Sequence, residues 1–116
     1  MKTLTELHSI EDLDRALTGS EHRPVLLFKH SLTCPISSRA YREFQSYLEN
    51  ANPGVDYDLI TIQTSRPVSD EVASRLGIEH ESPQAILVKN GKPVWSASHY
   101  EITESSLDDA VRGVLS

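Results

Sequence analysis

The sequence predicts an α/β fold in which a central mixed β-sheet of about four strands is flanked by helices on both faces. Segments with helical spacing of apolar residues alternate along the chain with short apolar segments that fit strands. The continuous apolar run 25–28 is typical of a strand covered on both faces. Near the end, two further apolar segments flank Asn90-Gly91, a dipeptide that favours a hairpin turn.

The first half of the chain predicts a helix, a strand, a second helix and a second strand. Ser9 with Asp12 three residues later is an N-terminal capping signal, and Gly19 is a typical end for this short helix. The run 25–28 leads directly into a segment with apolar residues at four-residue spacing, and 57–62 follows as the next strand. Two parallel strands joined by a helix form a βαβ unit.

The second half predicts a third helix, a hairpin and a closing helix. Ser69 is the expected N-cap of the third helix, because acidic residues follow it in the first turn. The segments 85–88 and 94–97 form the expected hairpin, and Thr103 begins the last helix.

Composition limits the class of protein. The 116 residues, 38% hydrophobic and 24% charged, fit one core, so we expect a single domain over 1–116. The net charge of −6 and the lack of any basic run argue against a nucleic-acid partner. No apolar stretch approaches the roughly 20 residues that span a bilayer, and the start turns acidic at Glu6, where a secretion signal would be apolar. We therefore expect a cytoplasmic protein without membrane contact.

Cys34 is the only cysteine, and it stands where the first strand becomes a helix. Pro35 suits the first helical position, which makes Cys34 the N-cap, with a sulfur that can accept from the N–H of Ile36 or Ser37. Unpaired N–H groups and the positive end of the helix dipole favour a thiolate, the nucleophilic form. A lone cysteine forms no internal disulfide, so this position indicates transient thiol exchange with another molecule.

Ser37 occupies the position of the second cysteine in a Cys-x-x-Cys enzyme, and its hydroxyl cannot resolve a mixed disulfide. Resolution would then need an external thiol. Two interpretations of Ser37 stay open: it donates a hydrogen bond to the thiolate, or it satisfies backbone groups of the first turn. Lys29 and His30 would add positive potential at Cys34 only if their side chains point toward it, which the sequence leaves open.

A metal site is not expected. The five histidines are scattered, and no His-x-x-x-His spacing accompanies the single cysteine. These histidines are His8, His22, His30, His80 and His99.

One set of motifs, in this order, resembles the monothiol bacilliredoxin (YtxJ-like) family of the thioredoxin-like superfamily, and the likeness covers nearly the whole chain. The motifs are Thr33-Cys34-Pro35-Ile36-Ser37, Glu81-Ser82-Pro83-Gln84, Asn90-Gly91, Trp95, and Ser98-His99 followed by Ile102-Thr103. The resemblance implies a thioredoxin-like fold and a thiol-disulfide oxidoreductase of redox homeostasis that removes bacillithiol from mixed disulfides on client proteins. It also implies that Cys34 attacks and carries the small thiol. Bacillithiol would be the co-substrate, and no cofactor is expected.

The same resemblance implies the residues of the site. Cys34 would be catalytic, with support from Thr33, Pro35, Ile36 and Ser37. Ser82, Pro83 and His99 would bind the thiol.

Pro83 would follow a cis peptide bond, and the Ser82 backbone would then pair with a bound thiol or polypeptide like an edge strand. His99 would bind an anionic part of the small thiol or orient a loop, unless it is only a polar loop residue. Arg66 either meets carboxylates of the ligand or is an exposed loop residue.

Other classes of function remain as alternatives. One is a thioredoxin-like binding or adaptor module in which Cys34 has no catalytic role. Another is a monothiol glutaredoxin-like enzyme that acts on a different low-molecular-weight thiol. A cysteine hydrolase that pairs Cys34 with a histidine is disfavoured, because no oxyanion-hole motif is present. The reactivity of Cys34 distinguishes an enzyme from an adaptor.

Overall fold

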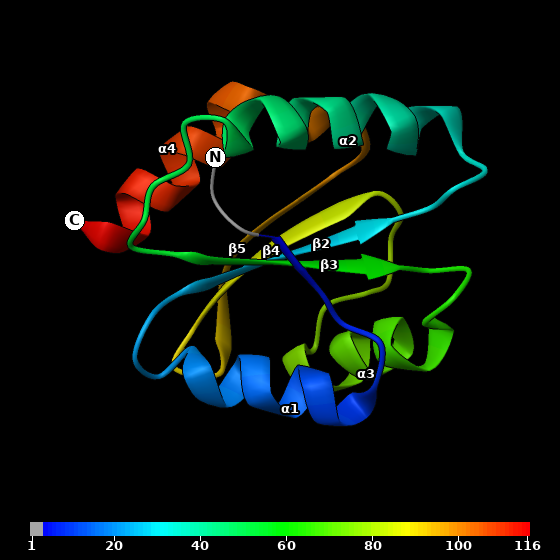
Figure 1. Ribbon diagram of the computed structural model, residues 1–116, viewed down its shortest axis with the longest axis horizontal. Helices are drawn as coiled ribbons and strands as arrows, with labels where there is room; N and C mark the ends of the chain where they lie inside the picture. Colours follow the sequence, from blue (N-terminus) through cyan, green and yellow to red (C-terminus); the bar gives the residue numbers. More distant parts are fainter. Residues whose placement is uncertain (1–3) are drawn as a thin grey trace.

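The computed structural model describes residues 4–116 and has the predicted layers, with a mixed sheet between two pairs of helices (Figure 1). Helices α2 and α4 cover one face, and α1 and α3 cover the other. The strand order is β1-β3-β2-β4-β5. The strands are β1 (Leu4–Glu6), β2 (Val25–His30), β3 (Asp56–Thr61), β4 (Gln84–Lys89) and β5 (Lys92–Ser98). The helices are α1 (Ile10–Gly19), α2 (Pro35–Leu48), α3 (Arg66–Leu76), the 3₁₀ helix η1 (His99–Glu101) and α4 (Glu104–Leu115).

Strand β2 is the centre of the sheet, and all six of its residues are buried. It pairs parallel with β3 and antiparallel with β4. Leu26 and Phe28 point into the core beneath α2 and α4, whereas Val25 and Leu27 point into the core beneath α1 and α3. The continuous apolar run therefore forms a strand covered on both faces, as predicted.

The sheet has five strands, one more than the sequence indicated. The additional strand β1 pairs parallel with β3 at the edge of the sheet. Its three residues are too few to show the alternation from which strands are recognised. The predicted domain 1–116 includes residues 1–3, which lie outside the described residues.

Local capping signals were correct at several boundaries. The Ser9 hydroxyl accepts from the Asp12 N–H at 3.1 Å, and the Thr103 hydroxyl accepts from the Ser106 N–H at 3.0 Å. Asn90 and Gly91 have φ values of 54° and 73°, as a tight hairpin turn with two positive φ angles requires. The hairpin is therefore confirmed.

The predicted start of the third helix was wrong. Helix α3 begins at Arg66 with Ser65 as its N-cap, and Ser69 lies buried within it. Pro67 is compatible with the first turn of a helix, so the chain becomes helical earlier than the acidic residues after Ser69 suggested. Arg66, for which a loop position was considered, is consequently a helical residue. Within residues 4–116, none of the helices combines the length and the apolar character that crossing a bilayer demands.

Candidate active site

Cys34 is the N-cap of α2 and lies just beyond the carboxyl end of β2. Its backbone is extended, with φ −100° and ψ 122°, and Pro35 occupies the first helical turn. The thiol is partly exposed, and the positive end of the helix dipole lies at this position. The expected hydrogen bond from the N–H of Ile36 or Ser37 to the sulfur is not formed. A thiol sulfur is a weak acceptor, which explains why this cap differs from those of Ser9 and Thr103.

The Ser37 hydroxyl is fully buried and holds the loop that leads to Cys34. It accepts from the Ser31 N–H at 2.9 Å and lies 2.9 Å from His30 Nδ1. The tautomer of His30 decides which of these two groups donates to the other. These contacts match the interpretation in which Ser37 satisfies backbone groups, because its hydroxyl bonds to the Ser31 N–H and the His30 ring.

His30 points to the α2 face of the sheet. Its ring stacks on Tyr41 with centroids 4.5 Å apart, and burial lowers its pKa. A buried imidazole with a lowered pKa is uncharged near neutral pH. His30 therefore contributes to the site through the Ser37 hydroxyl and not through positive charge.

Lys29 points to the opposite face and is fully buried beneath α3. Its ammonium donates to the Ser69 carbonyl at 3.0 Å and lies 3.2 Å from His80 Nδ1. Burial lowers the pKa of Lys29 to about 8, and Asp70 opposes this shift. The side chains of Lys29 and His30 thus leave β2 on different faces, and neither points freely toward the thiol.

Gln63 supports the loop before Cys34 and belongs to none of the motifs recognised in the sequence. Its amide oxygen accepts from the Leu32 N–H at 3.0 Å, and its amide nitrogen donates to the Ser31 hydroxyl at 3.0 Å. The same nitrogen lies 3.4 Å from the Thr33 hydroxyl. Gln63 follows β3, and parallel strands β2 and β3 end at the same edge of the sheet. That topology was the one available signal for this contact.

Pro83 lies at the same edge of the sheet as Cys34. The Ser82-Pro83 peptide bond is cis, as the resemblance implied. Gln84, the next residue, pairs with Lys29 near the end of β2. The Ser82 backbone lies just outside the β4 ladder, which begins at Gln84, and the Ser82 hydroxyl is buried without a partner among residues 4–116.

His99 adjoins the Pro83 segment. Its backbone N–H donates to the Pro83 carbonyl at 3.1 Å, and its ring Nδ1 lies 3.5 Å from Glu81. Register and hydrogen bonds therefore bring three predicted parts of the site to one edge: the segment 33–37, Pro83 and His99. Ile36 is half-buried within this segment, whereas Thr33 and Pro35 are exposed.

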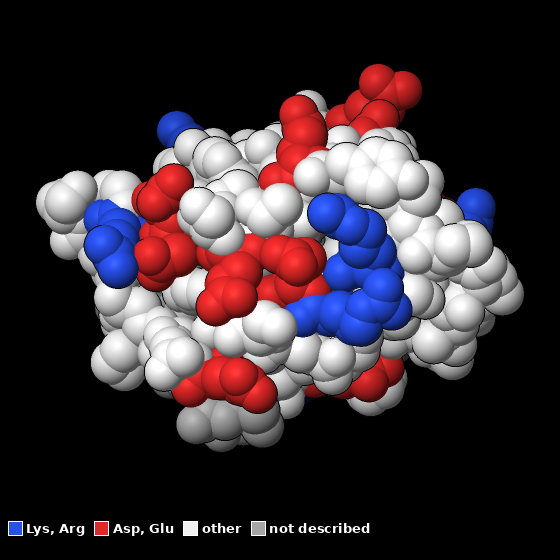
Figure 2. All heavy atoms as spheres, turned by 90° about the horizontal axis from the view of Figure 1, so that it is seen from above, with Lys and Arg blue, Asp and Glu red and all other residues white. Residues whose placement is uncertain are grey.

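Exposed apolar and basic side chains adjoin the site. Leu32 and Tyr100 are 59% and 63% exposed, and the Arg39 guanidinium lies 5.4 Å from the centroid of the Tyr100 ring. Arg39 and Arg42 belong to the exposed surface of α2. Figure 2, which looks onto α2 and α4, shows Lys and Arg side chains gathered in one patch beside a larger group of Asp and Glu side chains.

The arrangement suits thiol exchange through one sulfur. Cys34 is accessible at a helix N-terminus, and the side chain at the resolving position is a buried hydroxyl bonded elsewhere. Among residues 4–116, no group of three His, Cys, Asp or Glu side chains is placed to hold a metal ion.

Comparison with known proteins agrees with this chemistry. The family model described as "Monothiol bacilliredoxin BrxC" matches residues 5–107. A solved protein of inferred oxidoreductase activity with a thioredoxin fold is 36% identical, with a TM-score of 0.81 and 92% of each chain covered. Thioredoxin from Fasciola hepatica is 14% identical with a TM-score of 0.74, covering 94% of this chain and 97% of its own. Schistosoma mansoni thioredoxin is 15% identical with a TM-score of 0.76, covering 97% and 98%. The two thioredoxins support the fold alone.

Proposed function

The chain belongs to the monothiol bacilliredoxin family, and from this premise we propose that it removes bacillithiol from mixed disulfides on client proteins. The observation that carries the proposal is a single accessible cysteine at the start of α2, with Ser37 buried where a second thiol would stand. Such a site accepts a small thiol and has no side chain with which to release it.

The proposed reaction has two steps. The Cys34 thiolate attacks the bacillithiol sulfur of the mixed disulfide, a new disulfide forms between Cys34 and bacillithiol, and the client leaves as a thiolate that takes up a proton. An external low-molecular-weight thiol, deprotonated, then attacks the bacillithiol sulfur. Cys34 departs as a thiolate, and the two small thiols leave joined by a disulfide.

The geometry supports a role for the 82–83 segment in holding the substrate. The Ser82 backbone lies beyond the first paired residue of β4, so it is placed to pair with an extended client segment or with the amide groups of the small thiol. His99, held against the Pro83 carbonyl, borders the same segment. We assign the anionic part of the small thiol to the side of Cys34 that carries Pro83 and His99. We assign the client protein to the exposed surface around Leu32.

The test follows the stoichiometry of client release. The protein is mixed with a several-fold molar excess of a bacillithiolated client, and the appearance of the client thiol is followed with and without added free thiol. The proposal predicts release of at most one equivalent per Cys34 until free thiol is added, and continued turnover afterwards. The Cys34→Ser variant is the matched control and should release none. Several equivalents released without free thiol, or release by the control, would refute the monothiol cycle.

A further inference from the structure

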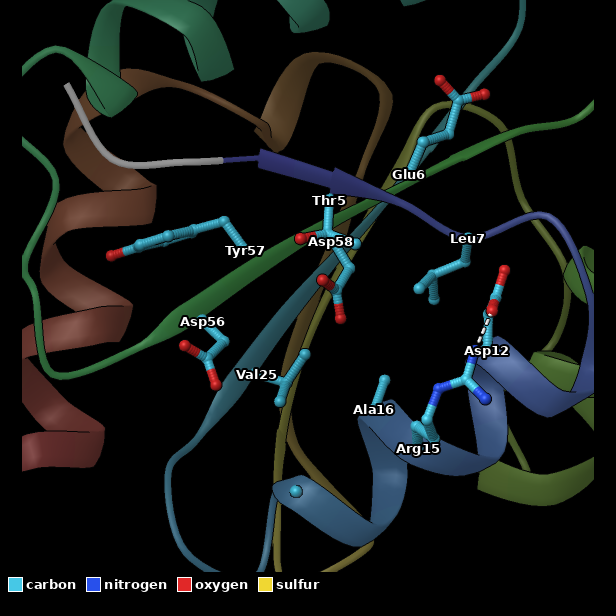
Figure 3. Close-up of a pocket in the computed structure, with 11 residues that line it drawn as sticks. Thr5, Glu6, Leu7, Asp12, Arg15, Ala16, Val25, Asp56, Tyr57 and Asp58 are labelled. Carbon is cyan, nitrogen blue, oxygen red and sulfur yellow. Dashed lines mark hydrogen bonds and ion pairs between the residues drawn. The ribbon is translucent and has the colours of Figure 1, made fainter.

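A cavity of about 460 Å³ lies between the edge strand β1, its neighbour β3 and helix α1 (Figure 3). It is on the α1 face of the sheet, whereas Cys34 begins α2, which covers the other face. Leu7, Ala16 and Val25 contribute apolar wall, and Asp58 projects into the space from β3. A cavity of this size is in the range that holds a small organic ligand, roughly 300–1,000 Å³.

Asp58 is the unusual residue of this cavity. It is 7% exposed, and no hydrogen bond or ion pair joins its carboxylate to any side chain or backbone N–H within residues 4–116. In the sheet it lies between Thr5 of β1 and Leu27 of β2. Burial, with a smaller contribution from Asp56, raises the pKa of Asp58 to about 7. A buried carboxylate without a partner is costly, and a cation placed against it removes that cost.

The other charged groups that face the cavity already have partners or lie at its mouth. Asp12 of α1 accepts from the backbone N–H of His8, which precedes the helix, and pairs with Arg15 one turn later. Asp56 pairs with Arg23 at 3.2 Å. Glu6 of β1 is partly exposed and lies 3.9 Å from His8. Asp58 is therefore the carboxylate with capacity left for a ligand.

We propose that this cavity binds a small aliphatic amine, with the ammonium group against the Asp58 carboxylate and the hydrocarbon part against Leu7, Ala16 and Val25. The chemistry of the walls selects this class: one deep carboxylate provides the charge, and the apolar side chains provide the contact for a short alkyl chain. A metal ion is a poor match, because it requires several oxygen ligands, whereas Asp12 and Asp56 are already paired and Glu6 is exposed at the mouth. The Thr5 hydroxyl, beside Asp58 in the sheet, supplies a second acceptor.

Binding depends on pH through Asp58. The amine stays protonated from pH 6 to pH 8. Asp58, in contrast, changes from mostly protonated to mostly ionised as the pH passes its pKa of about 7. The ionised fraction rises about tenfold between these two pH values, and the affinity should rise by a similar factor. Arg15 and Arg23 remain paired with Asp12 and Asp56 over this range and do not compete for Asp58.

The test is an NMR titration of ¹⁵N-labelled protein with 1-aminopentane at pH 6 and pH 8. We expect saturable shifts at β1, β3 and α1, about tenfold tighter binding at pH 8, and at least tenfold weaker binding to the Asp58→Asn variant at that pH. This variant removes a buried charge and keeps the shape of the side chain, so it is expected to fold. 1-Pentanol, the uncharged analogue, should bind at least tenfold more weakly than the amine.

Two further variants keep the test decisive. Asp56→Asn removes a neighbouring carboxylate that is already paired, and it should change the affinity by less than about threefold. Ala16→Leu narrows the cavity and should weaken binding while leaving Asp58 in place. Equal affinity of the wild-type protein and Asp58→Asn, equal affinity for amine and alcohol, or no saturable shifts at these elements would overturn the proposal.

Discussion

Replacing Lys29 by Met should change how the stability of the fold depends on pH. Lys29 is 0% exposed, and burial lowers its pKa from the ordinary 10.5 to about 8. In the unfolded chain the amine keeps its proton up to about pH 10.5, whereas the folded chain releases it above about pH 8. The unfolded state therefore binds more protons between these values, so stability rises with pH there and is flat below pH 8.

The magnitude follows from the size of the shift. Each pKa unit corresponds to about 1.4 kcal/mol, so the buried charge costs about 3 kcal/mol below pH 8. Wild type should thus gain about 2–3 kcal/mol relative to Lys29→Met between pH 7 and pH 10. At pH 7 the variant is relieved of the cost of the buried charge, about 3 kcal/mol, but it loses two hydrogen bonds that contribute about 1 kcal/mol each. The variant should therefore be the more stable protein at pH 7, by about 1 kcal/mol.

Urea unfolding at four pH values from 7 to 10 measures this difference in the free energy of unfolding. The pH dependence that the other titratable groups contribute is common to both proteins and cancels. Lys89→Met is the matched control, since Lys89 is exposed at the end of β4 and its removal should leave the pH profile parallel to that of wild type. A parallel profile for Lys29→Met as well would refute the inference that the buried ammonium costs stability.

Three further substitutions test the active site. Ser37→Ala should lower the free energy of unfolding by about 2 kcal/mol in urea titrations, because a backbone N–H and an imidazole nitrogen lose their buried partner; an unchanged stability would contradict the assignment of Ser37 to this network. Gln63→Ala should slow thiol exchange at Cys34 several-fold at unchanged secondary structure, since three contacts to the preceding loop disappear, whereas Gln45→Ala on the exposed side of α2 should leave the rate unchanged. Pro83→Ala should raise KM for a mixed-disulfide client by a larger factor than it lowers the rate at which iodoacetamide alkylates Cys34. A larger change in the alkylation rate than in KM would place Pro83 outside substrate capture.

Local sequence signals predicted the parts of the fold that local interactions determine. The capping pair at Ser9, the turn at Asn90-Gly91, the start of α4 after Thr103 and the cysteine at the start of α2 each depend on a few neighbouring residues. The start of α3 was misplaced because the sequence offers two serines as possible N-caps. Ser65 precedes a turn that contains Pro67, and Ser69 precedes two acidic residues. The helix begins after Ser65, and tertiary packing buries Ser69 within it.

The remaining features depend on contacts between distant segments. Gln63 meets Leu32 across 31 residues of chain, and Lys29 reaches Ser69 across 40. The direction of Lys29 and His30 became clear only from the two faces of β2, and Asp58 acquires its buried position from pairing with the edge strand β1. No spacing in the sequence encodes such contacts, so the candidate site was predicted at the segment 33–37, Pro83 and His99 and not at Gln63, which supports the start of that segment from just after β3.

The most direct measurement is the intact mass of the protein after incubation with a bacillithiolated client, with a glutathionylated client in parallel. The proposed mechanism predicts that wild type gains the mass of one bacillithiol on Cys34 as the client returns to its reduced mass. Cys34→Ser should gain none, and transfer of glutathione should be weaker. A client that loses bacillithiol without an adduct on Cys34, or an unmodified protein beside an unchanged client, would contradict a cysteine that carries the small thiol.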